Sequence, residues 1–300
     1  MNQVTKLRLD LGEAWLWAKL MFTAYGDTFG IVQKSAAYQT TFADLTYFAI
    51  FIGYPRSGHS LIGSLLDAHP NTLIAHRVNV LKYAQAGYKP TELFYLMLRN
   101  SARFAQTGRQ LTRYAYPVPG QWQGKFQTLQ VIGDQDGKGA LQRLASDATL
   151  LPGLTQMAKP QVKFIHVIRN PYDNITTWSL RLNRSLAHTS TRYFALCETV
   201  NQIKASIDAS CFIDIGYEQF VADPRNGLCE LCRFLGLTPS DEYLQACLRI
   251  VGKSPHQSRH DRVWSPKLVA WVQEQITHYA FLKDYVAQPD LRGLTNSRKS

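Results

Sequence analysis

Residues 47–60 read YFAIFIGYPRSGHS and pass from an apolar run into a loop that contains two glycines, an arginine and two serines. The run 47–53 is rich in residues that favour strands and predicts a buried strand, and the apolar spacing of 57–69 predicts a helix after the loop. Backbone N–H groups of such a loop face an oxyanion at the helix N-terminus. The spacing Gly-x4-Gly-x-Ser therefore predicts phosphate binding, with Arg56 as the cation and His59 in the place of the Walker lysine.

Other apolar runs follow the same pattern. Residues 162–168 (VKFIHVI) precede Asn170-Pro171, which is typical of a helix start, and residues 210–216 (SCFIDIG) precede a second such pair, Asp223-Pro224. Residues 131–133 predict a short strand. Strands that alternate with helices predict an α/β fold of three layers, with a central parallel sheet and helices on both faces. Because ligands bind at the carboxyl ends of parallel strands, the candidate site segments are 54–60, 169–177 and 217–218.

The composition restricts the class of protein and of partner. The chain has 300 residues, 45% of them hydrophobic and 18% charged, which is enough for a full core and excludes disordered and fibrous classes. Its net charge of +11 predicts an anionic partner, which could be nucleic acid, a membrane surface or a phosphorylated small molecule.

The N-terminal region carries no targeting signal that we can identify. No segment is apolar over the ~18 residues that a membrane span needs, and Asp10 and Glu13 are atypical of a signal peptide. Residues 12–24 predict an amphipathic helix. We therefore expect a soluble, cytoplasmic protein.

Four segments together resemble, in sequence order, the motifs of the sulfotransferase family that uses 3′-phosphoadenosine 5′-phosphosulfate (PAPS). They are Pro55–Ser60, Arg169–Asp173 with Thr177, Tyr217-Glu218, and Arg259 in a late basic loop. The bacterial-type branch of the family is the most similar, and the resemblance implies a P-loop-like sulfotransferase fold. It also implies that PAPS is bound by Arg56, Ser57, Gly58, His59 and Ser60 at the 5′-phosphosulfate, by Arg169, Thr177 and Arg259 at the 3′-phosphate, and by Tyr217 at the adenine.

The sequence departs from this family at the expected reaction centre. It has Arg77 after Ala75-His76, where the bacterial-type branch often has glutamate, the candidate base. The catalytic candidates are therefore Arg56, for charge on the bridging oxygen, and His76 or Asp134 as the base, with Lys138 as a replacement cation. The alternatives stay open: a buried, hydrogen-bonded histidine for His76 and a turn residue for Asp134.

The resemblance implies transfer of the sulfuryl group from PAPS to a hydroxyl or amine of a small-molecule acceptor such as a natural product, with release of 3′,5′-ADP. We expect a monomer or homodimer that needs no metal and no nucleic acid, with an N-terminal helical extension (1–46) packed on a sulfotransferase domain (47–300). An insert at about 78–160 would shape the acceptor pocket. Two alternatives are a PAPS- or nucleotide-binding protein without transfer activity, and a P-loop phosphotransferase, which the missing Walker lysine disfavours.

Overall fold

The structure is a computed structural model that describes residues 28–111, 114–157, 159–252 and 254–286. Its centre is a five-stranded parallel sheet with the strand order β2-β5-β1-β6-β7. The strands are β1 (Tyr47–Gly53), β2 (Thr72–Ala75), β5 (Val131–Asp134), β6 (Gln161–Ile168) and β7 (Phe212–Gly216). The predicted α/β class with a central parallel sheet is confirmed.

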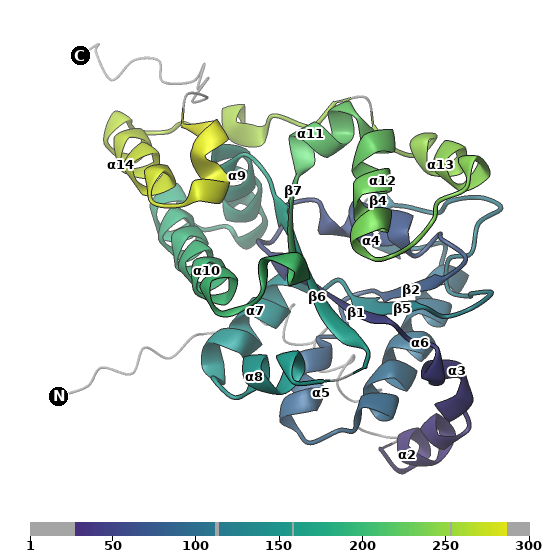
Figure 1. The fold of residues 1–300 in the computed structure, drawn as a ribbon. Helices are drawn as coiled ribbons and strands as arrows, with labels where there is room; N and C mark the ends of the chain where they lie inside the picture. The colour runs from purple at the N-terminus through teal and green to yellow at the C-terminus, as the bar shows by residue number, and fades with distance from the viewer. Residues whose placement is uncertain (1–27, 112–113, 158, 253, 287–300) are drawn as a thin grey trace, which may run out of the picture.

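Helices cover both faces of this sheet, and the middle strand shows why its sequence is continuously apolar. Phe48, Ile50 and Ile52 face one hydrophobic core, whereas Ala49 and Phe51 face the other. Successive side chains of a strand point to opposite faces, so a strand that is covered on both sides must be apolar at every position. The three-layer arrangement can be followed in Figure 1, where α4, α12 and α13 lie on one side of the sheet and α5, α6 and α8 on the other.

Among the described residues, the larger core contains side chains from α2 (Thr28–Ala36), α3 (Gln39–Ala43), α5 (Val80–Gln85), α6 (Pro90–Gln106), α7 (Gly137–Ser146), α8 (Leu150–Thr155), α9 (Pro171–Leu182), α10 (Leu186–Ser206), α14 (Pro266–Thr277) and the 3-10 helix η3 (Ala280–Tyr285). The smaller core contains side chains from α4 (His59–Leu66), α11 (Tyr217–Ala222), α12 (Pro224–Phe234) and α13 (Asp241–Leu248). Two short 3-10 helices, η1 (Ala209–Cys211) and η2 (Ser258–His260), lie in loops.

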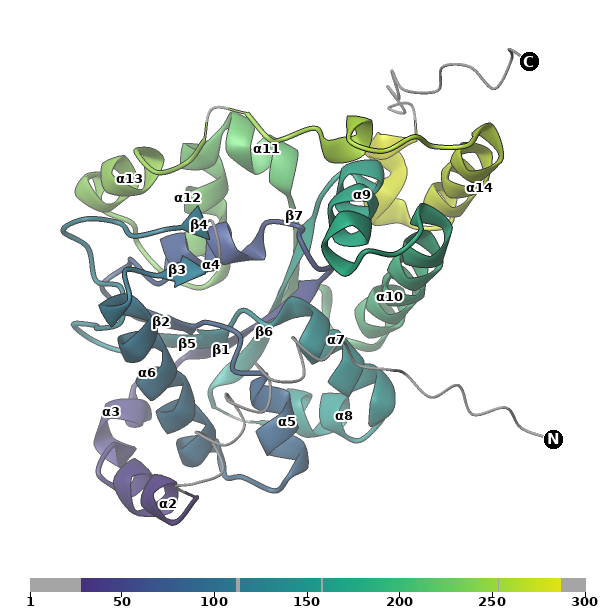
Figure 2. The same cartoon turned by 180° about the vertical axis from the view of Figure 1, so that it is seen from behind.

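Several elements differ from the sequence-based expectations. The helix after the phosphate loop begins at His59 rather than at Ser57. Gly58 has a φ of 107°, which lies outside the helical range, so the helix cannot include it. The strand β2 was not predicted. The range 78–160 is not one insertion, because it contains β5, which lies inside the sheet between β2 and β1. Outside the sheet this range forms α5, α6, α7, α8 and the hairpin of β3 (Gln110–Leu111) and β4 (Tyr114–Ala115), which Figure 2 shows beside α4 and α12.

The described part of the predicted N-terminal extension forms α2 and α3, which lie against α6 (Figure 1). Tyr38 and Phe42 contact Tyr95 and Phe94 of α6, with ring centroids 5.4 and 5.6 Å apart. The predicted helix at 12–24 lies outside the described residues. Within the described ranges, no helix is both long and apolar enough to cross a membrane.

Candidate active site

The phosphate loop follows β1 and ends at the N-terminus of α4. Gly58 is required there, because its φ is 107° and a methyl group on it would overlap the ring of Tyr217. The loop turns through a hydrogen bond of 3.3 Å from Ser57 N to Tyr54 O. The buried Ser57 hydroxyl lies 2.8 Å from His59 Nδ1, and Ser60 is half-buried at the second position of α4. The loop thus has the strand–loop–helix geometry that the sequence predicted.

Arg56 lies at the outer edge of this loop and has a left-handed backbone with a φ of 74°. Its guanidinium carbon is 5.6 Å from the ring centroid of Tyr114, which is half exposed in β4 and stacks against Tyr116 with an interplanar angle of 9°. Two aromatic side chains of the hairpin therefore stand beside the cation of the phosphate loop.

Arg169, at the end of β6, lies against the same loop. Its Nη1 donates to Arg56 O at 3.2 Å, its Nη2 donates to His256 O, and its guanidinium carbon is 5.8 Å from the ring centroid of Tyr217. Arg169 is only 7% exposed, and among the described residues no acceptor bonds its buried Nε. The structure therefore gathers three of the predicted PAPS-binding residues, Arg56, Arg169 and Tyr217, around the loop.

Thr177 of α9 and Arg259 of η2 both contact Asp173, so both are bonded within the protein. The Thr177 hydroxyl donates to Asp173 O at 2.8 Å and lies 2.6 Å from the Ser258 hydroxyl. Arg259 forms a buried ion pair with Asp173, with Nη2–Oδ2 at 2.8 Å and Nε–Oδ1 at 3.1 Å. The segment 258–260 is thereby docked on α9. A carboxylate, rather than an open space, faces the guanidinium of Arg259.

His76 follows β2 and lies in a closed environment. Its ring stacks on Phe104 with centroids 4.0 Å apart, and Nδ1 is bonded to the side-chain amide of Gln135. Burial is the main cause that lowers its pKa to about 3, and the cations Arg77 and Arg109 act in the same direction. The imidazole is therefore neutral at pH 7. Its Nε2 is buried without a hydrogen-bond partner among the described residues.

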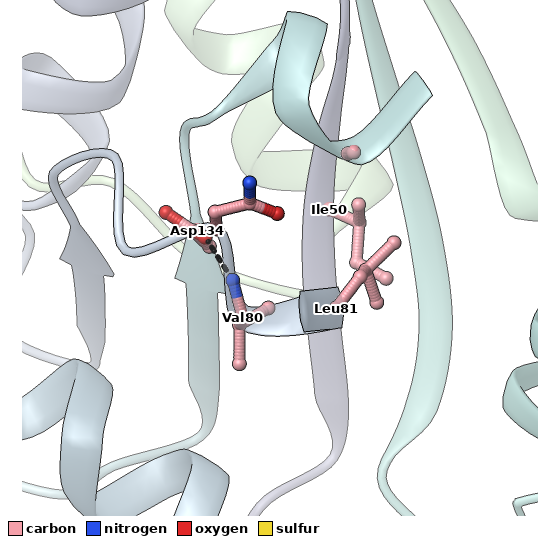
Figure 3. Close-up of a pocket in the computed structure, with 6 residues that line it drawn as sticks. Ile50, Val80, Leu81 and Asp134 are labelled. Atoms are coloured by element: carbon pink, nitrogen blue, oxygen red, sulfur yellow. Dashed lines mark hydrogen bonds between the residues drawn. The ribbon is translucent and has the colours of Figure 1, made fainter. Parts of the chain in front are cut away.

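Asp134 ends β5 and holds the turn that follows His76. Its two carboxylate oxygens accept backbone hydrogen bonds from Val78 N at 3.0 Å and Val80 N at 2.8 Å, the second of which is drawn in Figure 3. Burial, followed by the charge of Asp136, raises the pKa of Asp134 to about 7, against the lowering effect of these hydrogen bonds. The carboxylate of Asp134 thus fixes the backbone of the turn after His76.

The charges around the loop are mostly positive. Arg77, with 52% of its side chain exposed, has its Nε 4.0 Å from the largely buried Asp136. Burial and the charges of Arg77 and Arg56 lower the pKa of His59 to about 3, so His59 is also neutral at pH 7. Lys138 lies on α7, with its Nζ 6.0 Å from the ring centroid of Trp178. Because His59 is neutral, the positive charge around the loop comes from the arginines, and this charge suits an anionic ligand.

Comparison with known proteins agrees with this geometry. A sequence profile described as the sulfotransferase family matches residues 49–241, well over half of the chain. The chain belongs to the sulfotransferase family. The match includes most of β1, the phosphate loop, β6 with Arg169, and Tyr217, whereas Arg259 lies beyond it. No curated protein matches the sequence.

Three solved sulfotransferase structures are similar to the chain at low sequence identity. The sulfotransferase domain of the Synechococcus PCC 7002 olefin synthase is 18% identical over 70% of this chain and 81% of its own, with a TM-score of 0.42. A sulfotransferase domain from the curacin biosynthetic pathway is 14% identical over 78% and 96%, with a TM-score of 0.49. A mouse sulfotransferase complexed with PAP is 14% identical over 83% and 92%, with a TM-score of 0.47.

Sequence reasoning missed several polar residues around this sulfotransferase site. Glu218 accepts hydrogen bonds from Asn170 N at 2.9 Å and from the Tyr285 hydroxyl at 2.7 Å, which ties the end of β6 to η3. The motif Tyr217-Glu218 identifies Glu218 in the sequence, but its hydrogen-bond partners, Asn170 and Tyr285, come from distant segments. Gln135, whose side-chain amide is bonded to His76 Nδ1, comes directly after Asp134, and nothing in the local sequence predicts its contact with His76. Among the described side chains, no group of three or more His, Cys, Asp or Glu is arranged to hold a metal ion.

Proposed function

We propose that this protein transfers the sulfuryl group of PAPS to a hydroxyl or amine of a small-molecule acceptor and releases 3′,5′-ADP. PAPS carries anionic groups at both ends of an adenosine, so its site needs two cationic stations and an aromatic surface. The observation that carries the proposal is the bonded pair of Arg56 and Arg169, with the ring of Tyr217 beside both the loop and Arg169. Membership of the family supports the same class of transferase.

The proposed reaction forms a bond from the acceptor oxygen or nitrogen to sulfur and breaks the bond from sulfur to the 5′-phosphate oxygen. Charge then grows on that oxygen, and Arg56 with the loop N–H groups at Gly58, His59 and Ser60 and the hydroxyl of Ser57 would stabilise it. Arg169, with its buried and unbonded Nε, would hold the 3′-phosphate. Thr177 and Arg259 stand beside this station, and they would contact the 3′-phosphate only by exchanging their present partners around Asp173.

The acceptor proton needs a base, for which His76 remains our first choice and Asp134 the second. His76 is neutral and its Nε2 has no hydrogen-bond partner among the described residues, whereas both oxygens of Asp134 already accept backbone hydrogen bonds. Because the Gln135 amide nitrogen donates to Nδ1, Nε2 carries the ring proton, and His76 would act as a base from Nε2 only after the Gln135 amide turns its oxygen toward Nδ1. Arg77 cannot take this role, because a guanidinium stays protonated. Lys138 and Arg77 would add positive charge around the transferred group.

The enclosure of both base candidates favours one alternative, a protein that binds PAPS or a related nucleotide without transferring the sulfuryl group. Tight binding of 3′,5′-ADP with no sulfate transfer to any of a broad panel of phenols, alcohols and amines would support it. A phosphotransferase is less suited to this site, since His59 stands where the Walker lysine would contact phosphates. We further propose a cytoplasmic location, natural-product acceptors and a monomeric or homodimeric state.

A thermal-shift comparison without divalent metal tests the proposal. We expect 3′,5′-ADP to raise the Tm more than 5′-AMP or ATP at equal concentration, because only 3′,5′-ADP fills both cationic stations. A ligand at about 100 times its Kd adds roughly 2.7 kcal/mol to the unfolding free energy. Stabilisation by ATP that requires Mg²⁺, with none from 3′,5′-ADP, would instead establish the phosphotransferase.

A further inference from the structure

A line of buried polar side chains crosses the sheet directly behind the phosphate loop. The Tyr54 hydroxyl lies 3.1 Å from His166 Nε2, and His166 Nδ1 lies 2.8 Å from an oxygen of Asp214. Tyr54 and His166 are fully buried, whereas about a third of the Asp214 side chain is exposed. None of the three residues has a part in the reaction proposed above.

The register of the sheet places these residues in line. His166 in β6 is paired with Ile52 in β1 on one side and with Asp214 in β7 on the other. Tyr54 comes two residues after Ile52, so alternation along the strand direction brings its side chain to the same face as that of His166. Residues from three segments far apart in the sequence thus form one row across three neighbouring strands.

The direction of each hydrogen bond follows from the chemistry of the groups. An ionised carboxylate only accepts, so His166 must carry its proton on Nδ1 and donate it to Asp214. Burial lowers the pKa of His166 against the raising effect of Asp214, and a neutral ring with Nδ1–H has a free electron pair on Nε2. The Tyr54 hydroxyl therefore donates to His166. Asp214 sets the tautomer and His166 orients the tyrosine.

Aromatic rings, the thiol of Cys197 and one cation enclose the row, and the ring of Tyr193 lies against that of Tyr54 with centroids 4.4 Å apart. Phe281 of η3 and Phe212 of β7 contact the His166 ring edge-on, with centroids 5.0 and 6.0 Å away. At the outer end Lys204 of α10 forms an ion pair with the second oxygen of Asp214. The inner hydrogen bonds are therefore shielded from water, and in such surroundings they hold their geometry more strictly than on a surface.

Tyr54 connects this row to the phosphate loop through its own backbone. Its carbonyl oxygen accepts the hydrogen bond from Ser57 N that closes the loop's turn, and the Ser57 hydroxyl reaches His59. We propose that Asp214, His166 and Tyr54 are positioning residues, which set the phosphate loop for the 5′-phosphosulfate group by anchoring Tyr54. This inference rests on the proposed function, because it assumes that the loop binds that group.

Tyr54→Phe tests the inference, since it removes only the hydroxyl that His166 orients. Calorimetry should measure the Kd of 3′,5′-ADP and of 3′-AMP, which lacks the 5′-phosphate, for wild type and variant. We expect the variant to bind 3′,5′-ADP three- to tenfold more weakly, roughly the net effect of one buried hydrogen bond, and 3′-AMP unchanged. Equal losses for both nucleotides, or no loss for either, would overturn the inference.

Matched variants separate positioning from general stability. Tyr243→Phe also removes a buried, bonded hydroxyl, one that donates to Leu65 O at 3.0 Å, and it should lower the Tm without changing the ratio of the two Kd values. Asp214→Ala acts from the partly exposed end of the row and should shift that ratio in the same direction as Tyr54→Phe. Lys204→Met keeps the inner three residues bonded and should leave the ratio at its wild-type value. A shift with Tyr243→Phe or Lys204→Met, or none with Asp214→Ala, would contradict positioning.

The same titrations distinguish failure of the inference from failure of the proposed function. If wild type binds 3′,5′-ADP no better than 3′-AMP, the loop does not recognise a 5′-phosphate, and both the proposed function and the inference fail. If wild type prefers 3′,5′-ADP but Tyr54→Phe retains the full preference, the function stands and the positioning role alone is wrong.

Discussion

The guanidinium of Arg169 donates a hydrogen bond of 3.2 Å to the backbone carbonyl oxygen of Arg56, across 113 positions of sequence. This bond joins the segments that follow β1 and β6, each of which carries an arginine. The ring of Tyr217 lies against both Arg169 and Gly58. In a parallel sheet the carboxyl ends of neighbouring strands meet at one edge, which explains why two motifs so distant in sequence meet here. The loop and the predicted 3′-phosphate station therefore depend on each other.

Arg169→Ala should weaken 3′,5′-ADP more than 5′-AMP. A charged hydrogen bond is worth about 1.5 to 3 kcal/mol, which corresponds to roughly a ten- to hundredfold loss of affinity. Some loss for 5′-AMP is also expected, because the variant frees Arg56 O. Calorimetry with both nucleotides measures the difference, with Arg225→Ala on the exposed face of α12 as the control. An equal loss of affinity for both nucleotides would show that Arg169 does not bind the 3′-phosphate.

Asp173→Asn should destabilise the protein strongly. Asp173 and Arg259 are 1% and 7% exposed, and loss of one partner from a buried ion pair typically costs about 3 to 5 kcal/mol of unfolding free energy. Urea denaturation at pH 7 measures it. Asp241→Asn is the matched control, because it breaks the exposed pair of Asp241 with Arg225, which solvent screens. Similar midpoints for the two variants would show that the buried pair contributes little.

Local sequence patterns predicted much of the fold because their causes are local. Asn170 accepts a hydrogen bond from Tyr172 N at 3.0 Å as the cap of α9, and Asp223 accepts one from Asn226 N at 3.1 Å at the start of α12. Each cap is set by residues two or three positions away. Four residues are too few to show a period, which is why β2 was missed and β5 was predicted only as a short run at 131–133.

The sequence could predict which residues reach the site but not what each one contacts there. The motif around Arg259 supplied a cation, yet its partner, Asp173, lies within another motif 86 positions earlier. His76 is closed off by Phe104 of α6, and no pattern near His76 indicates that ring. Such pairings depend on how the helices pack, which a local pattern does not contain. The same holds for the row from Asp214 to Tyr54.

Gly58→Ala should abolish nucleotide binding while leaving most of the fold intact. The added methyl group would overlap Tyr217, and a φ of 107° is strained for any residue with a Cβ atom. Thermal shift with 3′,5′-ADP measures the loss. Gly153→Ala in α8 is the control, because open space surrounds that position and alanine suits a helix better than glycine. Wild-type affinity in Gly58→Ala would mean that Tyr217 moves aside and has no set position under the adenine.

The pH dependence of turnover should distinguish the two candidate bases. A general base must be deprotonated to act, so activity falls as the pH drops through its pKa. The pKa of His76 is lowered to about 3 by burial and neighbouring cations, so a reaction that uses His76 should keep a constant kcat between about pH 5 and 7. The pKa of Asp134 is raised to about 7, so a reaction that uses Asp134 should lose close to tenfold in kcat per pH unit over that range.

His76→Ala completes this test. If His76 takes the acceptor proton, the variant should lose at least about a hundredfold in kcat, since a positioned base typically contributes 10² to 10⁴. Its Kd for 3′,5′-ADP should stay unchanged, because among the described residues the His76 ring contacts Phe104 and Gln135 and not Arg56 or Arg169. Near-wild-type turnover in the variant, together with a kcat that rises toward pH 7, would assign the proton to Asp134. A constant profile with an active variant would mean that the acceptor arrives already deprotonated and that His76 only packs the turn after β2.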